Sequence, residues 1–333
     1  MIITKTPFRI SFFGGGSDLP CWYKENCGAV LSTTIDKYCY ITCRSLPQFF
    51  DYKHRIVYSK IELINDINDI KHPSVKETFK FMRINNGIEL HHDGDLPART
   101  GLGSSSAFTV GLLNALYGLQ GKIISKMKLA LDAIHVEQEL IKENVGSQDQ
   151  VAAAFGGFNK ITFSGNHLID VKPVTISLKK INNLQNHLML FFTGFTRFAD
   201  EIEKDKINSI TQKTKEYSEL CGMVEESIKI LNQDIEHLHD FGKLLNESWK
   251  LKKSLSDKVS TTFIDNIYEK GMKNGALGGK ILGAGGGGFI LFFVPEENRN
   301  RIMEALKDLL YIPFNFESMG SQIIYYKGSE IEI

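Results

Sequence analysis

A short stretch rich in glycine and serine, Leu96 to Ala107, separates two segments of different periodicity. The residues from Ile88 to Asp93 alternate with the two-residue period of a strand, and apolar residues recur at helical spacing from Phe108 to Leu119. A glycine turn that opens a helix offers unpaired backbone N–H groups at the positive end of the helix dipole, where phosphate commonly binds. The stretch therefore predicts either a phosphate site or a plain serine-rich helix cap.

Composition narrows the class of protein. The chain has 333 residues, enough for two domains, and its 42% hydrophobic and 23% charged residues are typical of a soluble globular protein. Its 39 basic and 39 acidic side chains give zero formal net charge. We therefore expect no nucleic-acid partner, because a phosphate-backbone interface needs excess positive charge, while a small anionic substrate remains possible.

No segment predicts export, membrane insertion or a cysteine-based metal site. The densest apolar run, Phe289 to Val294, is far shorter than the ~20 residues of a membrane span and is typical of a buried strand. Charged residues and Pro7 interrupt the first 13 residues, so they do not form a signal peptide. The five cysteines form no C-x-x-C pair and are expected to be reduced thiols. A cytoplasmic protein that does not bind membranes is expected.

A second glycine loop lies near the N-terminus. Residues 2–13 predict a strand interrupted at Pro7, and Gly14-Gly15-Gly16 must form a loop after it. Arg9 lies in the strand and Asp18 ends the loop, which is either a binding loop or a tight turn with a capping aspartate. The β-forming run from Ala29 to Cys43 predicts a hairpin that turns at Asp36-Lys37.

A third glycine loop covers Gly278 to Gly288. Its Gly283-x-Gly285-x-x-Gly288 spacing matches the dinucleotide fingerprint, but that motif must open a helix. Here the β-rich run that begins at Phe289 follows, so the loop leads into a strand. No Walker A pattern occurs anywhere in the chain.

Two carboxylates accompany these loops. Glu137 lies in the second half of a helix predicted over Ser125 to Lys142, where a solvated helix face would explain it equally well. Asp149 precedes the apolar run Val151 to Phe155, so it either caps a buried helix or takes part in chemistry. Farther along, the polar run Ser177 to Asn186 predicts a domain boundary, and the region from Phe198 to Lys273 is predicted to be mostly helical.

Three glycine loops, a serine-lined helix start and a well-placed aspartate favour phosphoryl transfer to a small molecule, which depends on positioning and charge neutralisation. The same residues resemble the three motifs of the GHMP small-molecule kinases, the family of galactokinase, homoserine kinase and mevalonate kinase. The motifs match Pro7 to Asp18, Pro97 to Ala107 and Lys280 to Phe289, with Ser106 where the family has alanine. The separation of Glu137 and Asp149 is also that of galactokinase. Within the family, the chain most resembles the D-glycero-D-manno-heptose 7-phosphate kinase branch.

The resemblance implies a two-domain α+β fold. The N-terminal domain, residues 1–182, would resemble domain 2 of ribosomal protein S5 and would contain the phosphate loop. The C-terminal domain, residues 183–333, would be ferredoxin-like with extra helices. The active site would lie between them. The implied reaction transfers the γ-phosphoryl group of ATP to the anomeric hydroxyl of a sugar phosphate and gives heptose 1,7-bisphosphate, on a route to nucleotide-activated heptose.

The resemblance also implies the roles of single residues. Asp149 would be the catalytic residue that faces the acceptor hydroxyl, as a base or as an orienting charge, with Arg9 beside it. Mg²⁺ would be held by Ser104 and Glu137. ATP would contact Arg99, Gly101, Gly103, Ser104, Ser105, Ser106, Gly285, Gly286 and Gly287, and the sugar would contact Gly16, Ser17 and Asp18.

The sequence leaves open which sugar accepts the phosphate. The 7-phosphate of the implied acceptor would need its own cations, and Arg99, Arg197, Arg44 and Lys160 are candidates that could equally be surface charges. A kinase for fucose, galactose or a uronic acid is one alternative function. A non-catalytic sensor of sugar and nucleotide is another, although such a protein is expected to have a damaged site. The sequence does not predict the oligomeric state.

Overall fold

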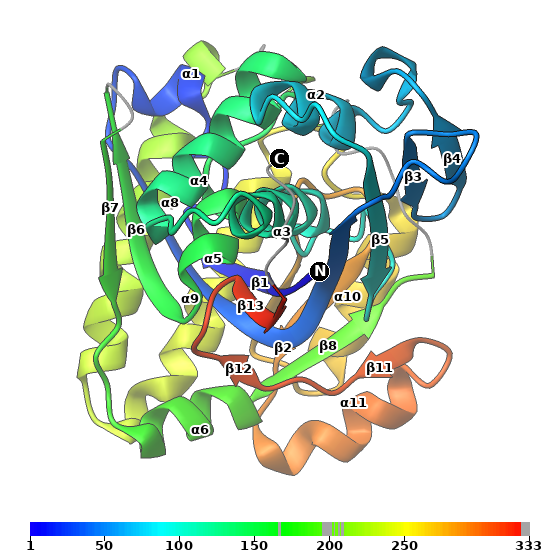
Figure 1. Ribbon diagram of the computed structural model, residues 1–333. Coiled ribbons are helices and arrows are strands. Elements are labelled where there is room, and N and C mark those ends of the chain that lie inside the picture. Colours follow the sequence, from blue (N-terminus) through cyan, green and yellow to red (C-terminus); the bar gives the residue numbers. More distant parts are fainter. Residues whose placement is uncertain (166–167, 195–201, 203, 206, 208–209, 328–333) are drawn as a thin grey trace.

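The computed structural model describes residues 1–165, 168–194, 202, 204–205, 207 and 210–327. Two sheets and the helices packed around them make up this part of the chain (Figure 1). The larger sheet has the order β13-β1-β2-β5-β3-β4, and β6, β7 and β12 extend it along β2. Its strands are β1 (Ile2–Phe13), β2 (Gly28–Ser45), β3 (His54–Val57), β4 (Ile61–Ile64), β5 (Ile88–Gly94), β6 (Phe158–Ser164), β7 (Leu168–Pro173), β12 (Phe316–Glu317) and β13 (Gln322–Tyr326).

The smaller sheet is antiparallel in the order β11-β8-β10-β9. Its strands are β8 (Leu188–Phe192), β9 (Gly278–Ile281), β10 (Phe289–Phe293) and β11 (Leu310–Ile312). The helices of the described residues are α1 (Pro20–Tyr23), α2 (Pro73–Phe81), α3 (Ser104–Leu119), α4 (Lys126–Ile134), α5 (Gln148–Phe155), α6 (Leu178–Asn186), α8 (Thr214–Asn232), α9 (Leu238–Lys253), α10 (Thr262–Lys273) and α11 (Arg299–Ala305). None of these helices is both long enough and apolar enough to cross a membrane.

Helix α3 lies at the centre of the molecule (Figure 1). Its apolar side chains are buried on nearly every side, as expected for a core helix. Gly111 lets α3 approach β1 closely, because a Cβ there would lie only 2.9 Å from Thr6 Oγ1. Thr4 Oγ1 donates a hydrogen bond to Gly111 O at 3.0 Å. The core therefore fixes the position of α3, whose first turn contains Ser104, Ser105 and Ser106.

The hairpin predicted at Asp36-Lys37 is wrong, because β2 continues from Gly28 to Ser45. The two residues form an irregularity in the strand: Pro7 pairs with Tyr38, whereas the next residue, Phe8, pairs with Ile35. Asn315 fixes this bulge by donating its backbone N–H and its side-chain amide to the Asp36 carboxylate, at 2.8 and 2.9 Å. The polar residues that suggested a turn instead meet a segment from the far end of the chain.

The polar run predicted as a domain boundary is helix α6, and Ser177 caps it by accepting a hydrogen bond from Lys180 N at 3.3 Å. The last strands, β12 and β13, return to the larger sheet and pair with β2 and β1. The division between residues 182 and 183 stays a prediction. The helical region expected from Phe198 to Lys273 contains α8, α9 and α10, while residues 195–201, 203, 206 and 208–209 lie outside the described residues.

Candidate active site

The three glycine loops predicted from the sequence meet at one cleft. One loop follows β1, the second precedes α3, and the third joins β9 to β10. Of the predicted site residues, the cleft is lined by Arg9, Gly16, Asp18, Arg99, Gly101, Gly103, Ser104, Ser105, Ser106, Asp149, Gly285 and Gly287. Segments from both ends of the chain therefore form a single site.

The second and third loops touch through their backbones, which explains two of the glycines. Gly101 has φ +84°, and a Cβ on it would lie 2.4 Å from Leu282 O. Gly283 has φ +65°, and its Cβ would lie 2.5 Å from the Cα of Gly101. No other residue type fits such an approach in these backbone conformations. The hydrogen bond from Phe289 N to Thr100 O, at 3.1 Å, also joins the two loops.

Helix α3 begins after Gly103, which takes a left-handed conformation (φ +74°) and provides no side-chain cap. Ser104 Oγ accepts a hydrogen bond from Arg99 N at 3.1 Å, so this serine orders the preceding loop. The plain serine cap considered above is therefore not what forms. The first turn of a 16-residue core helix opens at the cleft, with the positive end of its dipole.

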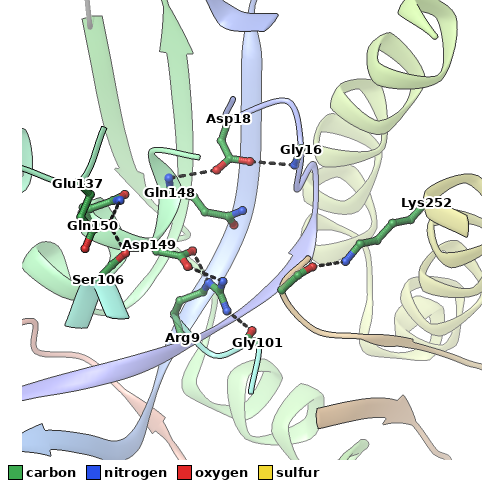
Figure 2. A network of polar contacts seen from close by, with 11 residues as sticks. Arg9, Gly16, Asp18, Gly101, Ser106, Glu137, Gln148, Asp149, Gln150 and Lys252 are labelled. Carbon is green, nitrogen blue, oxygen red and sulfur yellow. Dashed lines mark hydrogen bonds and ion pairs between the residues drawn. The ribbon is translucent and has the colours of Figure 1, made fainter. Parts of the chain in front are cut away.

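Arg9 and Asp149 form a bidentate ion pair in the cleft (Figure 2). Arg9 Nε lies 2.7 Å from Asp149 Oδ1, and Arg9 Nη2 lies 2.8 Å from Oδ2. The remaining nitrogen, Nη1, donates to Gly101 O at 2.6 Å. Asp149 lies in the first turn of α5, as predicted. The arginine thus orients the carboxylate and ties it to the backbone of the second glycine loop.

The predicted sugar-binding residues separate into two groups. Asp18 Oδ1 accepts from Gly16 N at 2.8 Å and Oδ2 accepts from Gln148 N at 3.2 Å, so the carboxylate bridges the first loop and α5 (Figure 2). Ser17 differs, because it is fully buried and does not line the cleft. Its Oγ lies 2.8 Å from Gly14 O and accepts from Ala29 N at 3.0 Å. Ser17 therefore ties the loop to β2 and does not face a ligand.

Glu137 is buried, so the solvated helix face considered for it is wrong. It lies in a π-helical segment, His135–Leu140, which follows α4. Its Oε2 accepts hydrogen bonds from Ser106 Oγ, at 2.8 Å, and from Gln150 Nε2. Burial raises the pKa of Glu137 to about 7, although its hydrogen bonds favour the charged form.

The serine beside Glu137 is Ser106, whereas the predicted metal pair was Ser104 with Glu137. Residues two apart on a helix point to opposite faces, and Ser104 bonds to the loop backbone instead. Among the described residues, no hydrogen bond joins Ser104 to Glu137, the two residues predicted to hold the metal.

Comparison with known proteins identifies the family. Residues 73–157 match the family described as GHMP kinases N terminal domain, and residues 225–312 match GHMP kinases C terminal. The chain is 32% identical to a D-glycero-alpha-D-manno-heptose 7-phosphate kinase of Campylobacter jejuni, over 96% of this chain and 97% of that protein. The chain belongs to the GHMP kinase family. The predicted two-domain kinase fold and phosphotransferase class are thereby confirmed.

More distant members of the family agree with this assignment. A galactokinase of Pyrococcus furiosus is 24% identical over 92% of each chain. The crystal structure of a D-glycero-D-manno-heptose 1-phosphate kinase from Bacteroides thetaiotaomicron superposes with a TM-score of 0.73, covering 98% of this chain and 100% of that one at 23% identity. This structural likeness shows the GHMP kinase fold.

Two lysines for which no role was predicted also line the cleft of this GHMP kinase. Lys252, in the last turn of α9, donates to Ile281 O and Gly283 O at 3.2 and 2.5 Å (Figure 2). Lys280 donates to Phe12 O at 2.7 Å. Both are buried. Lys280 lies within the third motif and could have been singled out, whereas a lysine at a helix C-terminus is ordinary.

The candidates for binding the phosphate of the acceptor sugar differ in position. Arg99 lines the cleft of the kinase, whereas Arg44 pairs with Glu89 and Lys160 pairs with Glu225. Arg197 lies outside the described residues. Gly286, predicted to contact ATP, does not line the cleft, and its N–H donates to Val259 O at 2.8 Å.

Proposed function

We propose that this GHMP kinase transfers the γ-phosphoryl group of ATP to the anomeric hydroxyl of D-glycero-D-manno-heptose 7-phosphate. The product would be the 1,7-bisphosphate, an intermediate of nucleotide-activated heptose synthesis. The observation that carries the proposal is the Arg9–Asp149 pair, whose carboxylate opens into the cleft beside the phosphate loop. The Campylobacter jejuni relative, named as a heptose 7-phosphate kinase, supports the choice of acceptor.

The donor side of the cleft suits the phosphates of ATP. The N-terminus of α3 and the glycine backbones of the second and third loops present N–H groups with no side chain between them and a ligand. Arg99, which belongs to the second loop, adds a positive charge to the lining of the cleft. These groups would bind and orient the γ-phosphate for attack.

The acceptor side centres on Asp149. As the anomeric oxygen forms its bond to the γ-phosphorus, the bond from phosphorus to the ADP oxygen breaks, and the acceptor proton must leave. Asp149 can accept that proton or hold the hydroxyl in line for attack. Arg9 keeps the carboxylate in place and offsets negative charge that develops nearby.

The residues around Glu137 fit a magnesium ion. Glu137 Oε1 and Gln150 Oε1 are both buried and have no hydrogen-bond partner among the described residues, and Ser106 Oγ lies beside them. Mg²⁺ in kinases commonly takes one or two protein oxygens and completes its shell with phosphates and water. Glu137 and Ser106 would therefore hold Mg²⁺, whose chemistry is to neutralise phosphate charge.

A panel of acceptors tests the proposal. Purified protein with ATP and Mg²⁺ is offered heptose 7-phosphate, the unphosphorylated heptose, fucose, galactose and a uronic acid, and ADP release is measured. We expect the highest kcat/KM with heptose 7-phosphate. Preference for an unphosphorylated sugar would instead favour another sugar 1-kinase. Tight binding of sugar and nucleotide without turnover on any acceptor would favour a sensor.

A further inference from the structure

Two polar side chains of the cleft contain buried atoms without hydrogen-bond partners. Ser11 Oγ and Gln148 Oε1 are inaccessible to solvent and have no partner among the described residues. The whole of Ser11 is 95% buried, since its exposed fraction is 5%. Native proteins rarely leave such atoms unpaired, because each loses its bonds to water and gains none in return. Both residues line the cleft, so a ligand there can supply the missing bonds.

Both side chains are immediate neighbours of the Arg9–Asp149 pair. Ser11 follows Arg9 by two residues on β1, and alternate residues of a strand point to the same face. Gln148 directly precedes Asp149 in the first turn of α5, and its backbone N–H donates to Asp18. Figure 2 shows the Gln148 side chain between Asp18 and the ion pair.

Gly15 leaves open the space between these two side chains. A Cβ built on Gly15 would lie 3.6 Å from Gln148 Nε2 and 3.6 Å from Ser11 Oγ, which are ordinary contact distances. The backbone of Gly15 is not in the left-handed region, unlike that of Gly14 and Gly16. Neither strain nor a clash therefore requires glycine at position 15.

We infer that Gly15, Ser11 and Gln148 form a subsite that binds a sugar hydroxyl adjacent to the one that is phosphorylated. This inference rests on the proposed function. The amide oxygen of Gln148 accepts a hydrogen bond from that hydroxyl, and Ser11 Oγ donates a second hydrogen bond to the hydroxyl oxygen. The glycine leaves room for the oxygen. The site therefore selects an acceptor with two neighbouring hydroxyls, and it rejects one in which the second hydroxyl is missing.

Substitutions at these positions, combined with a deoxy acceptor, test the subsite. The reference is the best acceptor of the panel, and the probe is its 2-deoxy derivative. For the wild-type protein we expect kcat/KM to fall about 10-fold or more on the probe. Ser11→Ala and Gln148→Leu should each lose about 10-fold on the reference and little on the probe, because the missing bond has already been lost. Equal losses on both acceptors would overturn the inference.

Gly15→Ala tests the same space without removing a polar group. The added methyl group should raise the KM for the reference acceptor about 10-fold or more and leave the KM for ATP and the unfolding temperature unchanged. Gly222→Ala on α8 is the matched control, since a Cβ there meets nothing within 4 Å. A Gly15→Ala protein with wild-type acceptor KM would overturn the inference. Because the wild-type protein must turn over the reference acceptor first, failure of the proposed function would be seen separately.

Discussion

Two arginine–carboxylate clusters in this kinase differ in which partner is buried, the arginine or the carboxylate. In the cleft, the Arg9 side chain is 4% exposed and the Asp149 side chain is 24% exposed. On the larger sheet, Glu89 of β5 is 6% exposed, and its partners Arg44 and Arg55 are 48% and 36% exposed. In the cleft the arginine is buried and the carboxylate is open to a ligand. On the sheet the arginines cover a buried carboxylate.

The partners of Glu89 occupy both of its oxygens. Arg44 Nε lies 2.6 Å from Oε2, and Arg55 Nη1 and His91 Nε2 lie 2.7 and 3.1 Å from Oε1. Burial opposes the charged form, but the hydrogen bonds from His91, Arg44 and Arg55 outweigh it and lower the pKa of Glu89 to about 2. An ion pair by itself therefore does not indicate catalysis, and only the pair in the cleft leaves its carboxylate accessible, as the proposed reaction requires.

The largest expected effect is that of Asp149→Asn. Asparagine keeps the shape but cannot accept the acceptor proton, so we expect kcat to fall by about 10²- to 10⁴-fold. Turnover under saturating ATP and sugar phosphate measures this change, and circular dichroism checks the fold. Turnover close to that of the wild-type protein would mean that the open carboxylate has no role in the reaction.

Glu89→Gln should lower the free energy of unfolding and leave kcat nearly unchanged. Loss of the buried charge leaves Arg44 and Arg55 less well paired, and we expect unfolding to cost about 1–3 kcal/mol less in urea titrations. The kcat should stay within about twofold, since Glu89 does not line the cleft. A 10-fold fall in kcat would show that the ion pairs of Glu89 influence the active site.

The same variant should change the acid stability. The pKa of Glu89 is about 2 in the folded protein against an ordinary value of 4.5. The unfolded chain therefore takes up a proton first as the pH falls, and the stabilisation present above pH 4.5 is lost between pH 4.5 and 2. Unfolding free energy measured across this window should fall less steeply for Glu89→Gln. Parallel curves would contradict the assignment of the low pKa to Glu89.

Lys252→Met should have a smaller effect, which divides between protein stability and ATP binding. Methionine keeps much of the aliphatic stem but loses the bonds to Ile281 O and Gly283 O, so the third glycine loop is less firmly held. We expect a loss of about 1–2 kcal/mol in stability and a few-fold rise in the KM for ATP. Lys250→Met, at an exposed position of the same helix, is the control. If the two variants had the same stability and the same KM for ATP, Lys252 would have no role in the site.

The smallest effect is expected for Lys160→Ala. Lys160 pairs with Glu225, whose side chain is more than half exposed, and such surface pairs contribute about 0.2–1 kcal/mol. We expect little change in stability and no change in the KM for the sugar phosphate. A large rise in that KM would place the phosphate of the acceptor sugar near Lys160 and not in the cleft.

The parts of the site that follow from short sequence patterns could be predicted. The glycine loops, the strand after the third loop and the helix position of Asp149 depend on neighbours in the chain. The partner of Glu137 could not be predicted, because a π-helical segment and the rotation of α3 decide that Ser106 meets it. The Asp36 bulge and the contacts of Lys252 depend on segments that are distant in the sequence.

The position of the new phosphate on the product tests the proposed reaction most directly. Wild-type protein and Asp149→Asn are incubated with ATP, Mg²⁺ and heptose 7-phosphate, and the product is examined by ³¹P and ¹H NMR. We expect a second phosphate ester whose phosphorus couples to the anomeric proton, formed by the wild-type protein and nearly absent with Asp149→Asn. A phosphate on any other carbon, or equal product from both proteins, would contradict it.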